Sequence, residues 1–290
     1  MTEQLFFASR HRDLERIELA LRAAAELLLR FSSAVVAVDF KDGGDPVTHA
    51  DSAVNDLLCS MLPRNGEGWL SEESSDNARR LSKERIWVVD PLDGTKEFIQ
   101  GIPEWCVSIG LVEDGIAVAG GVANPSSGEI LLGSVETGLI AKPTPLPKTK
   151  KPENREPIVL ASRSEHTKGQ WDCYQGGCFR VLPTGSIAGR LARVAAGFAD
   201  ATWTLGPRHE WDVAGGVALI RAAGGRVEVA PGREPIFNQP SARLNRLAAF
   251  GPDCGDVLPQ LRNSAWGFGW PPVERRAPLT RDEFERYELE

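Results

Sequence analysis

Cysteine and histidine are sparse in this sequence, and neither is spaced as in a structural metal or disulfide site. The chain has five cysteines and four histidines among 290 residues. The cysteines are odd in number and no two form a C-x-x-C pair, so neither a disulfide framework nor a zinc knuckle is predicted. The histidines show no ligand spacing, which argues against histidine-based zinc chemistry. We therefore expect a protein of the reducing cytoplasm.

Long apolar runs and an excess of positive charge are also missing. Charged residues interrupt the apolar stretches of the first 31 residues, so we expect no membrane-spanning segment and no signal peptide. The formal net charge of -7 argues against a nucleic-acid polymer as partner, because phosphate-backbone binding depends on clustered Lys and Arg. A small anionic substrate remains compatible with this charge, since a bound cation can invert the local field.

The hydrophobic residues, which make up 42% of the chain, follow two kinds of pattern. Residues 14–31 and 47–62 repeat apolar side chains at spacings of three and four, which predicts two helices. Residues 86–142 contain short β-rich runs separated by turn sequences, which is typical of an antiparallel meander. After a segment rich in Pro and Lys at 142–157, strand and helix patterns alternate, with helices expected over 184–200 and 211–223.

These patterns predict a layered α/β protein. Residues 1–145 are expected to form an N-terminal α/β subdomain, and residues 146–265 a C-terminal α/β subdomain. Residues 266–290 are charged and aperiodic, which predicts a loosely held tail.

The stretch WVVDPLDGTKEF ends a buried-looking strand with two aspartates three residues apart. Side chains alternate along a strand, so Asp90 and Asp93 would point apart if the strand continued. Pro91 is expected to stop the strand, and Gly94 to let the backbone begin a helix near Thr95. Both carboxylates could then converge beside backbone N–H groups that suit a phosphate oxygen. Two carboxylates would repel a phosphate, so hard divalent cations would have to lie between the carboxylates and the phosphate. Oxygen-only ligands point to Mg²⁺.

Purely structural roles for these acidic residues stay open at this point. Asp93 could merely cap a helix, and Asp212 of EWDVAGG could cap another. Glu72 and Glu73 of SEES could be a solvated pair in a loop. An EF-hand is excluded, because the third and sixth positions counted from Asp90 are Leu and Thr. A P-loop motif is absent as well.

Four motifs occur in a fixed order, GDPVTHAD, WLSEES, WVVDPLDGT and EWDVAGG. Together they resemble the inositol monophosphatase superfamily of magnesium-dependent, lithium-sensitive phosphatases, over about residues 10 to 250. The resemblance implies an αβαβα sandwich of the sugar-phosphatase type, with two subdomains and an active site at their junction. It also implies a phosphoric monoester hydrolase, and homodimers are frequent among such relatives.

The resemblance assigns roles to individual residues. It implies two to three Mg²⁺ ions, for which Mn²⁺ could substitute, bound by Glu72, Asp90, Asp93, Asp212 and the carbonyl of Leu92. Asp51 would pair with Thr95 to orient a metal-bound water. Two or more metal ions can lower the pKa of that water, bridge the phosphate and stabilise the leaving alkoxide. No covalent nucleophile is then needed.

The substrate side resembles one branch of the superfamily in particular. DGTKEF, EWD and KDGGDPVT look like the 3'(2'),5'-bisphosphate nucleotidases, which remove the 3'-phosphate from adenosine 3',5'-bisphosphate. The substrate-binding residues that this resemblance implies are Lys41, Gly94, Thr95, Ser186, Arg190 and Glu210. Asp45 departs from the serine common in that branch, and Arg190 from a lysine. Asn124-Pro125 resembles the inositol-phosphate branch as much as the nucleotidase branch.

Alternatives to this function and to these contacts stay open. An inositol phosphate or another sugar or polyol phosphate is the alternative substrate, and a non-catalytic metal- or phosphate-binding regulator is the alternative from another class. Asp51 and Thr95 speak against the regulator, because a pure binder would not need a water-orienting pair. Ser186 could be only an N-cap, Arg190 a solvated helix residue, and Glu210 a surface charge.

Overall fold

The computed structural model describes residues 3–32, 38–40, 46–64, 66–143, 155–174 and 177–267. Within these residues, no helix combines the length and apolar character needed to cross a membrane. Lys41, Asp45 and most of the predicted C-terminal tail lie outside them.

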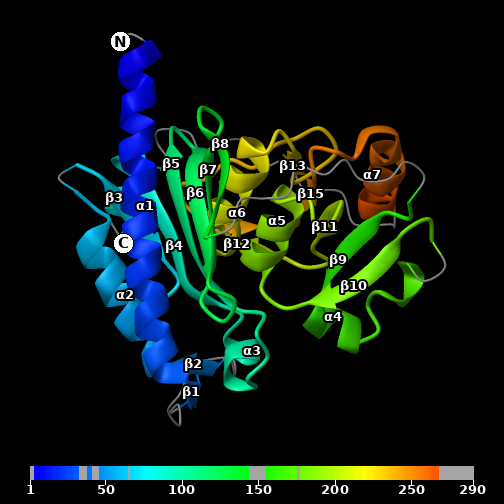
Figure 1. The fold of residues 1–290 in the computed structure, drawn as a ribbon, viewed down its shortest axis with the longest axis horizontal. Helices are drawn as coiled ribbons and strands as arrows, with labels where there is room; N and C mark the ends of the chain where they lie inside the picture. The colour runs from blue at the N-terminus through cyan, green and yellow to red at the C-terminus, as the bar shows by residue number, and fades with distance from the viewer. Residues whose placement is uncertain are drawn as a thin grey trace.

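A six-stranded sheet forms the centre of the first half of the chain (Figure 1). Its strands in spatial order are β3 (Gly68–Ser71), β4 (Arg85–Asp93), β5 (Cys106–Glu113), β6 (Ile116–Asn124), β7 (Glu129–Ser134) and β8 (Gly138–Lys142). Strands β4 to β8 pair antiparallel with their neighbours in the sequence, which confirms the predicted meander. Strand β3 is parallel to β4 and ends beside the Asp90 end of that strand.

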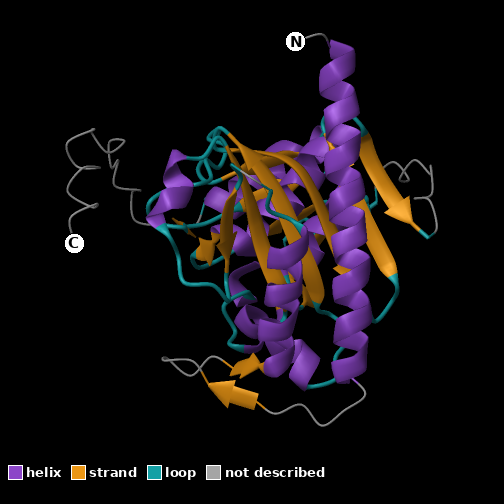
Figure 2. Ribbon diagram, turned by 90° about the vertical axis from the view of Figure 1, so that its left-hand side faces the viewer, coloured by secondary structure: helices purple, strands orange, loops and turns teal. Residues whose placement is uncertain are grey.

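Helices cover both faces of this sheet. Helices α1 (Glu3–Ser32) and α2 (His49–Met61) lie on one face, in front of the strands in Figure 2. Helices α5 (Ile187–Ala195) and α6 (Glu210–Ala222) lie on the other face. Apolar side chains of α1, α2 and the sheet make one core, and those of α5, α6 and the opposite sheet face make a second. Burial of these side chains is the main stabilising contribution.

A second sheet lies beyond α5 and α6 (Figure 1). Its spatial order is β10 (Arg180–Thr184), β9 (Ile158–Ser162), β11 (Ala201–Trp203), β15 (Ala248–Phe250) and β13 (Arg226–Glu228). The outer face packs on α7 (Leu258–Trp266) through a third, aromatic-rich core. The layers therefore run helix, sheet, helix, sheet, helix, which is the predicted αβαβα sandwich.

Short elements complete the described part of the chain. They are β1 (Val38–Phe40), β2 (Pro46–Thr48), β12 (Arg208–His209), β14 (Arg243–Leu244), α3 (Thr95–Ile99), α4 (Arg163–Thr167) and the 3₁₀ turns η1 (Ala78–Ser82), η2 (Asp172–Tyr174) and η3 (Gly255–Val257). Two predicted helices are shorter than expected. The helix predicted over 47–62 begins at His49, because residues 46–48 pair in β2. The helix predicted over 184–200 covers only Ile187–Ala195, because Thr184 belongs to β10.

Candidate active site

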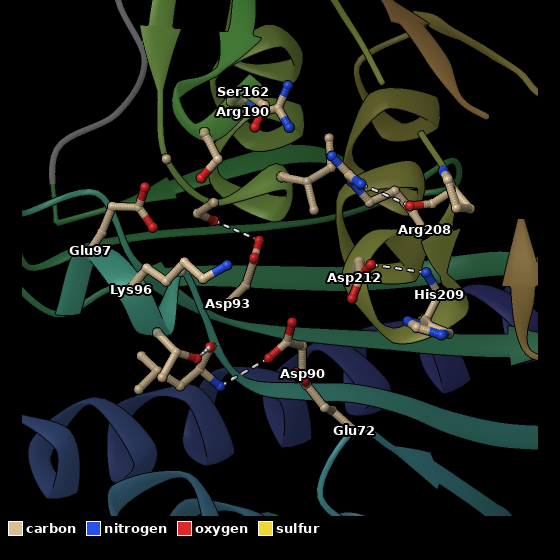
Figure 3. Close-up of a pocket in the computed structure, with 18 residues that line it drawn as sticks. Glu72, Asp90, Asp93, Lys96, Glu97, Ser162, Arg190, Arg208, His209 and Asp212 are labelled. Atoms are coloured by element: carbon tan, nitrogen blue, oxygen red, sulfur yellow. Dashed lines mark hydrogen bonds between the residues drawn. The ribbon is translucent and has the colours of Figure 1, made fainter. Parts of the chain in front are cut away.

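Strand β4 carries the two central aspartates on one face by means of a β-bulge. Asp90 pairs with Ser108 and Asp93 with Cys106, so three steps along β4 match two steps along β5. The extra residue cancels the alternation that would otherwise send the two side chains to opposite faces. The prediction that Pro91 ends the strand is therefore wrong, since the strand continues to Asp93. The expected convergence of both carboxylates nevertheless occurs, now on the face covered by α5 and α6 (Figure 3).

The turn after β4 is fixed by close packing. Gly94 has a φ of 97°, which favours glycine, and a Cβ there would lie 2.9 Å from the carbonyl oxygen of Glu104. Thr95 begins α3, as predicted, and its hydroxyl donates to the carbonyl of Leu92 at 3.1 Å. The backbone N–H of Leu92 donates to Asp90 Oδ1 at 3.0 Å. The loop that carries the predicted metal ligands is thus held by its own hydrogen bonds.

A cavity of about 380 Å³ opens at this end of β4, at the N-terminal ends of α5 and α6 (Figure 3). It brings together most of the site residues that the sequence predicts, from four different stretches of the chain. The lining includes Glu72, Asp90, Leu92, Asp93, Gly94, Thr95, Ser186, Arg190 and Asp212.

One side of the cavity is an acidic wall, which we define as Glu72, Asp90, Asp93 and Asp212. Asp90 is buried at the end of β4, and its pKa is raised well above the usual value by burial and then by the charges of Glu72 and Asp93. Burial and the charge of Asp93 raise the pKa of Asp212 to about 8. The carboxylates of this wall therefore repel one another when they are ionised.

The donor chemistry of the acidic wall fits a hard divalent cation. Carboxylates offer only acceptor oxygens, and a cation such as Mg²⁺ among them would remove their mutual repulsion. Among the described residues, however, no three His, Cys, Asp or Glu side chains are already gathered into a ligand cluster. Asp93 Oδ2 accepts hydrogen bonds from Ser186 Oγ at 2.7 Å and Ala188 N at 2.6 Å, while Asp212 Oδ2 accepts one from His209 N at 2.9 Å. Asp212 therefore also caps its helix, the alternative that the sequence left open.

The other side is a basic wall, which we define as Lys96, Arg190 and Arg208. Arg190 is only 2% exposed, and its Nη1 donates to Thr202 Oγ1 at 3.1 Å. Its Nε has no hydrogen-bond partner in the described part of the chain. Burial and the neighbouring Arg208 lower the pKa of Arg190 to about 10. Figure 3 shows Arg190 and Arg208 across the cavity from Asp90, while Lys96 enters from the side of Glu97 and points toward Asp93.

Within the described part of the chain, two predicted residues, Asp51 and Glu210, do not line the cavity. Lys41 lies outside the described residues. Asp51 is buried in the first turn of α2 and raises the pKa of Asp90, so it lies close behind the acidic wall. Glu210 is completely buried, and its two oxygens accept backbone hydrogen bonds from Asn238 at 2.7 Å and Gln239 at 3.0 Å. Its carboxylate is taken up by this turn and does not line the cavity, so the contact between Glu210 and substrate stays a prediction, while its burial shows that it is not a surface charge.

The structural alternatives that the sequence left open hold for Ser186 but not for Arg190. Ser186 is the N-cap of α5, accepting a hydrogen bond from Gly189 N at 2.8 Å, and it also lines the cavity beside Asp93. Arg190 is not the solvated helix residue that the sequence left as an alternative, because it is buried in the cavity wall.

Sequence reasoning missed several lining residues. Lys96 and Glu97 follow Thr95 directly, and Arg208 and His209 precede EWD. Glu165 accepts a hydrogen bond from Arg208 Nη2 at 2.8 Å and so holds this side chain in the wall. The signal that could have found them is their position beside recognised motifs.

The sequence pattern of the inositol monophosphatase family matches residues 10–250. This chain belongs to the inositol monophosphatase family. An inositol-1-monophosphatase of Mesorhizobium japonicum is 31% identical over 235 residues, which cover 78% of this chain and 88% of the relative. A histidinol-phosphatase of Mycobacterium tuberculosis is 38% identical over 120 residues, or 40% of this chain and 45% of the relative.

The fold is shared with solved structures of the same family. The crystal structure of CysQ from Bacteroides thetaiotaomicron, a bacterial member of the inositol monophosphatase family, matches with a TM-score of 0.70 at 26% identity. The match covers 84% of this chain and 98% of that one. The chain is thus a phosphatase of this family, for which dependence on Mg²⁺ is typical.

Proposed function

We propose that this chain hydrolyses a phosphate monoester of a small polyol, of the inositol 1-phosphate class, and that Mg²⁺ binds at the acidic wall. The observation that carries the proposal is the cavity itself, in which an acidic wall with raised pKa values faces a basic wall. A phosphate ester with its metal ions matches both walls at once. The inositol-1-monophosphatase among the relatives supports the polyol as the alcohol part.

Individual residues of this chain would have the following roles. Glu72, Asp90, Asp93, Asp212 and the carbonyl of Leu92 would hold the metal. When bound, Mg²⁺ lowers the pKa of water and stabilises negative charge on phosphate oxygens. Thr95 would orient the attacking water and relay its proton to Asp51 behind the acidic wall, and the backbone of Gly94 and Thr95 would contact the phosphate. Arg190 and Arg208 would bind the anionic substrate from the basic wall.

A second substrate is favoured by one specific observation. Arg190 is a buried cation with an unpartnered Nε in the described part of the chain, and Arg208 and Lys96 lie in the same wall. This is more positive charge than a metal-bound monophosphate requires, and it suits a second anionic group. Adenosine 3',5'-bisphosphate, losing its 3'-phosphate, is therefore the second candidate.

A substrate panel tests the proposal. Phosphate release is measured with and without Mg²⁺ from inositol 1-phosphate, adenosine 3',5'-bisphosphate, histidinol phosphate and fructose 1,6-bisphosphate. We expect Mg²⁺-dependent release, with a preference of at least about tenfold in kcat/KM for one class, which equals about 1.4 kcal/mol of discrimination. Absence of release from all four esters would favour the non-catalytic regulator instead.

A further inference from the structure

Arg80 forms a buried junction between two distant segments of the chain. It lies in η1, is only 3% exposed, and its Nε and Nη2 donate to the two oxygens of Asp76 at 2.7 and 2.8 Å. Its Nη1 donates to Asn238 Oδ1 at 2.8 Å, and Nη2 also donates to the carbonyl of Gln239 at 2.9 Å. Asn238 returns a hydrogen bond from Nδ2 to the carbonyl of Arg80 at 3.2 Å. A bidentate guanidinium with further backbone partners is a rigid connection.

Glu210 continues this junction into helix α6. The backbone N–H groups of Asn238 and Gln239 both donate to the carboxylate of Glu210, which is fully buried. Asn238 has a φ of 57°, a left-handed conformation that asparagine tolerates better than most residues. We call the set Asp76, Arg80, Asn238, Gln239 and Glu210 the strap.

The two ends of the strap coincide with two parts of the acidic wall. Asp76 lies on the same loop as Glu72, four residues further along the chain, between β3 and η1. Glu210 is the first residue of α6 and precedes Asp212 by two positions. Glu72 and Asp212 thus come from different layers of the fold, and the strap joins the segments that carry them.

We propose that Arg80 and Glu210 are positioning residues for the metal centre, which hold the Glu72 loop against the Asp212 helix. The inference rests on the proposed function, since it assumes that Mg²⁺ binds at the acidic wall. Ligand oxygens must be held within about 0.5 Å of their working positions, and side chains that only support the ligands provide this restraint. Without the hydrogen bonds of the strap, the loop that carries Glu72 is no longer held at a fixed distance from α6.

Glu228 offers a matched control. It is also a buried carboxylate, 5% exposed, and it accepts hydrogen bonds from Arg262 Nε at 3.2 Å and Trp266 Nε1 at 3.2 Å. It joins β13 to α7 in the second half of the fold and does not line the cavity. Loss of Glu228 removes a buried bridge of similar kind without touching the segments that carry the acidic wall.

The test compares Glu210→Gln with Glu228→Gln in the full chain. In Glu210→Gln, the amide N–H₂ faces one of the two backbone N–H donors, which leaves a buried donor without an acceptor. The Mg²⁺ dissociation constant is measured by calorimetry, Tm by thermal unfolding, and kcat and KM by phosphate release. We expect Glu210→Gln to raise the Mg²⁺ dissociation constant about tenfold, while kcat at saturating Mg²⁺ stays within about twofold of the parent. Glu228→Gln should lower Tm and leave Mg²⁺ affinity unchanged.

Asp76→Asn serves as a milder variant if Glu210→Gln does not fold, because the Asp76 side chain is 44% exposed. It should raise the Mg²⁺ dissociation constant in the same direction by a smaller factor. Arg80→Lys keeps the charge but loses the bidentate geometry, so it should restore only part of the affinity lost in Arg80→Ala.

The outcomes separate the strap from the proposed function. If the parent protein binds Mg²⁺ and releases phosphate but the strap variants keep its Mg²⁺ affinity, the positioning role is overturned. If the parent protein neither binds Mg²⁺ nor releases phosphate, the proposed function fails and removes the premise of the strap.

Discussion

The acidic and basic walls of the cavity differ in how far neighbouring residues compensate their charges. The carboxylates of the acidic wall raise one another's pKa, and Asp90 does so while buried. In the basic wall, Arg208 is paired with Glu165, while Arg190 bonds to the neutral hydroxyl of Thr202. The basic wall offsets part of the repulsion in the acidic wall, since Arg190 and Arg208 lower the pKa of Asp93 and Arg208 lowers that of Asp212, but burial still leaves both pKa values raised. A cation at the acidic wall and an anion at the basic wall, as we propose, would offset the rest.

Removing one carboxylate should disrupt the acidic wall and give the largest effect. We expect Asp90→Asn to reduce Mg²⁺-dependent phosphate release about a thousandfold, because the metal supplies several kcal/mol of transition-state stabilisation. The measurement is initial-rate phosphate release at saturating Mg²⁺. Asp256→Asn, at an exposed position of η3, is the control and should retain the parent rate. Near-parent turnover in Asp90→Asn would exclude a catalytic acidic wall.

Without a bound cation, the free energy of unfolding should depend on pH, because the buried carboxylates of the acidic wall repel one another when they are ionised. The pKa of Asp212 is about 8 in the folded protein against 3.8 as the ordinary value, so the folded state binds this proton more tightly. The stability that this proton contributes is fully present below about pH 4 and is lost as the pH rises through 8. In EDTA, the free energy of unfolding should therefore fall between pH 5 and pH 8.

Adding Mg²⁺ should reverse this loss. At a concentration of 100 times its dissociation constant, a bound ligand adds about 2.7 kcal/mol to the free energy of unfolding. The gain should be larger at pH 8 than at pH 5, because protons compete with the metal for the same oxygens. Urea unfolding in EDTA and in Mg²⁺ at both pH values measures it, and an equal gain at both would contradict the assignment.

Changing the basic wall should affect substrate binding more than turnover. Arg190→Lys keeps a positive charge but loses Nε and the planar fork, so we expect KM to rise about tenfold with kcat within about twofold. Measuring KM for two substrates locates the anionic group that Arg190 binds. A rise confined to adenosine 3',5'-bisphosphate would place a second anionic group at Arg190, whereas an equal rise for inositol 1-phosphate would place the shared phosphate there.

The smallest effect is expected at Ser186, which lies where the two walls meet. Its hydroxyl donates to Asp93, accepts from Gly189 N and lies 3.1 Å from Cys106 Sγ. Ser186→Ala should cost about 1 kcal/mol of stability through loss of the N-cap. Ser186→Gly should cost less, because the native φ of 46° favours glycine. Chemical denaturation measures both, and the reverse order would show that backbone strain plays no part.

Local sequence patterns were sufficient for the main helices and the meander and, together with the family resemblance, for half of the cavity lining. The periodicity of α1 reflects its one buried face, and the nearly continuous apolar runs of β4 and β5 reflect burial on both faces of the sheet; this information is local. The site residues within the four motifs were found through the resemblance that the motifs carry together, and WLSEES, WVVDPLDGT and EWDVAGG each contribute to the cavity lining. The division into residues 1–145 and 146–265 stays a prediction.

Features that depend on register or on distant contacts were not predictable in the same way. The bulge at Asp90 to Asp93 is defined by pairing with β5, which the sequence of β4 alone does not contain. The burial of Glu210 was not predicted, because its partners, Asn238 and Gln239, lie 28 and 29 residues further along the chain. The burial of Arg190 is not evident from the sequence of α5, because it depends on the packing of this helix against α6 and the second sheet.

The extra residue in β4 makes this enzyme sensitive to a kind of mutation that leaves its composition almost intact. Val89 and Leu92 belong to the core under α1 and α2, while Asp90 and Asp93 face the cavity. An added residue in β5 between Cys106 and Ser108 would match three steps with three, restore regular alternation and turn one carboxylate towards that apolar core. Such an insertion in β5 should therefore be selected against even where substitutions in that strand are tolerated.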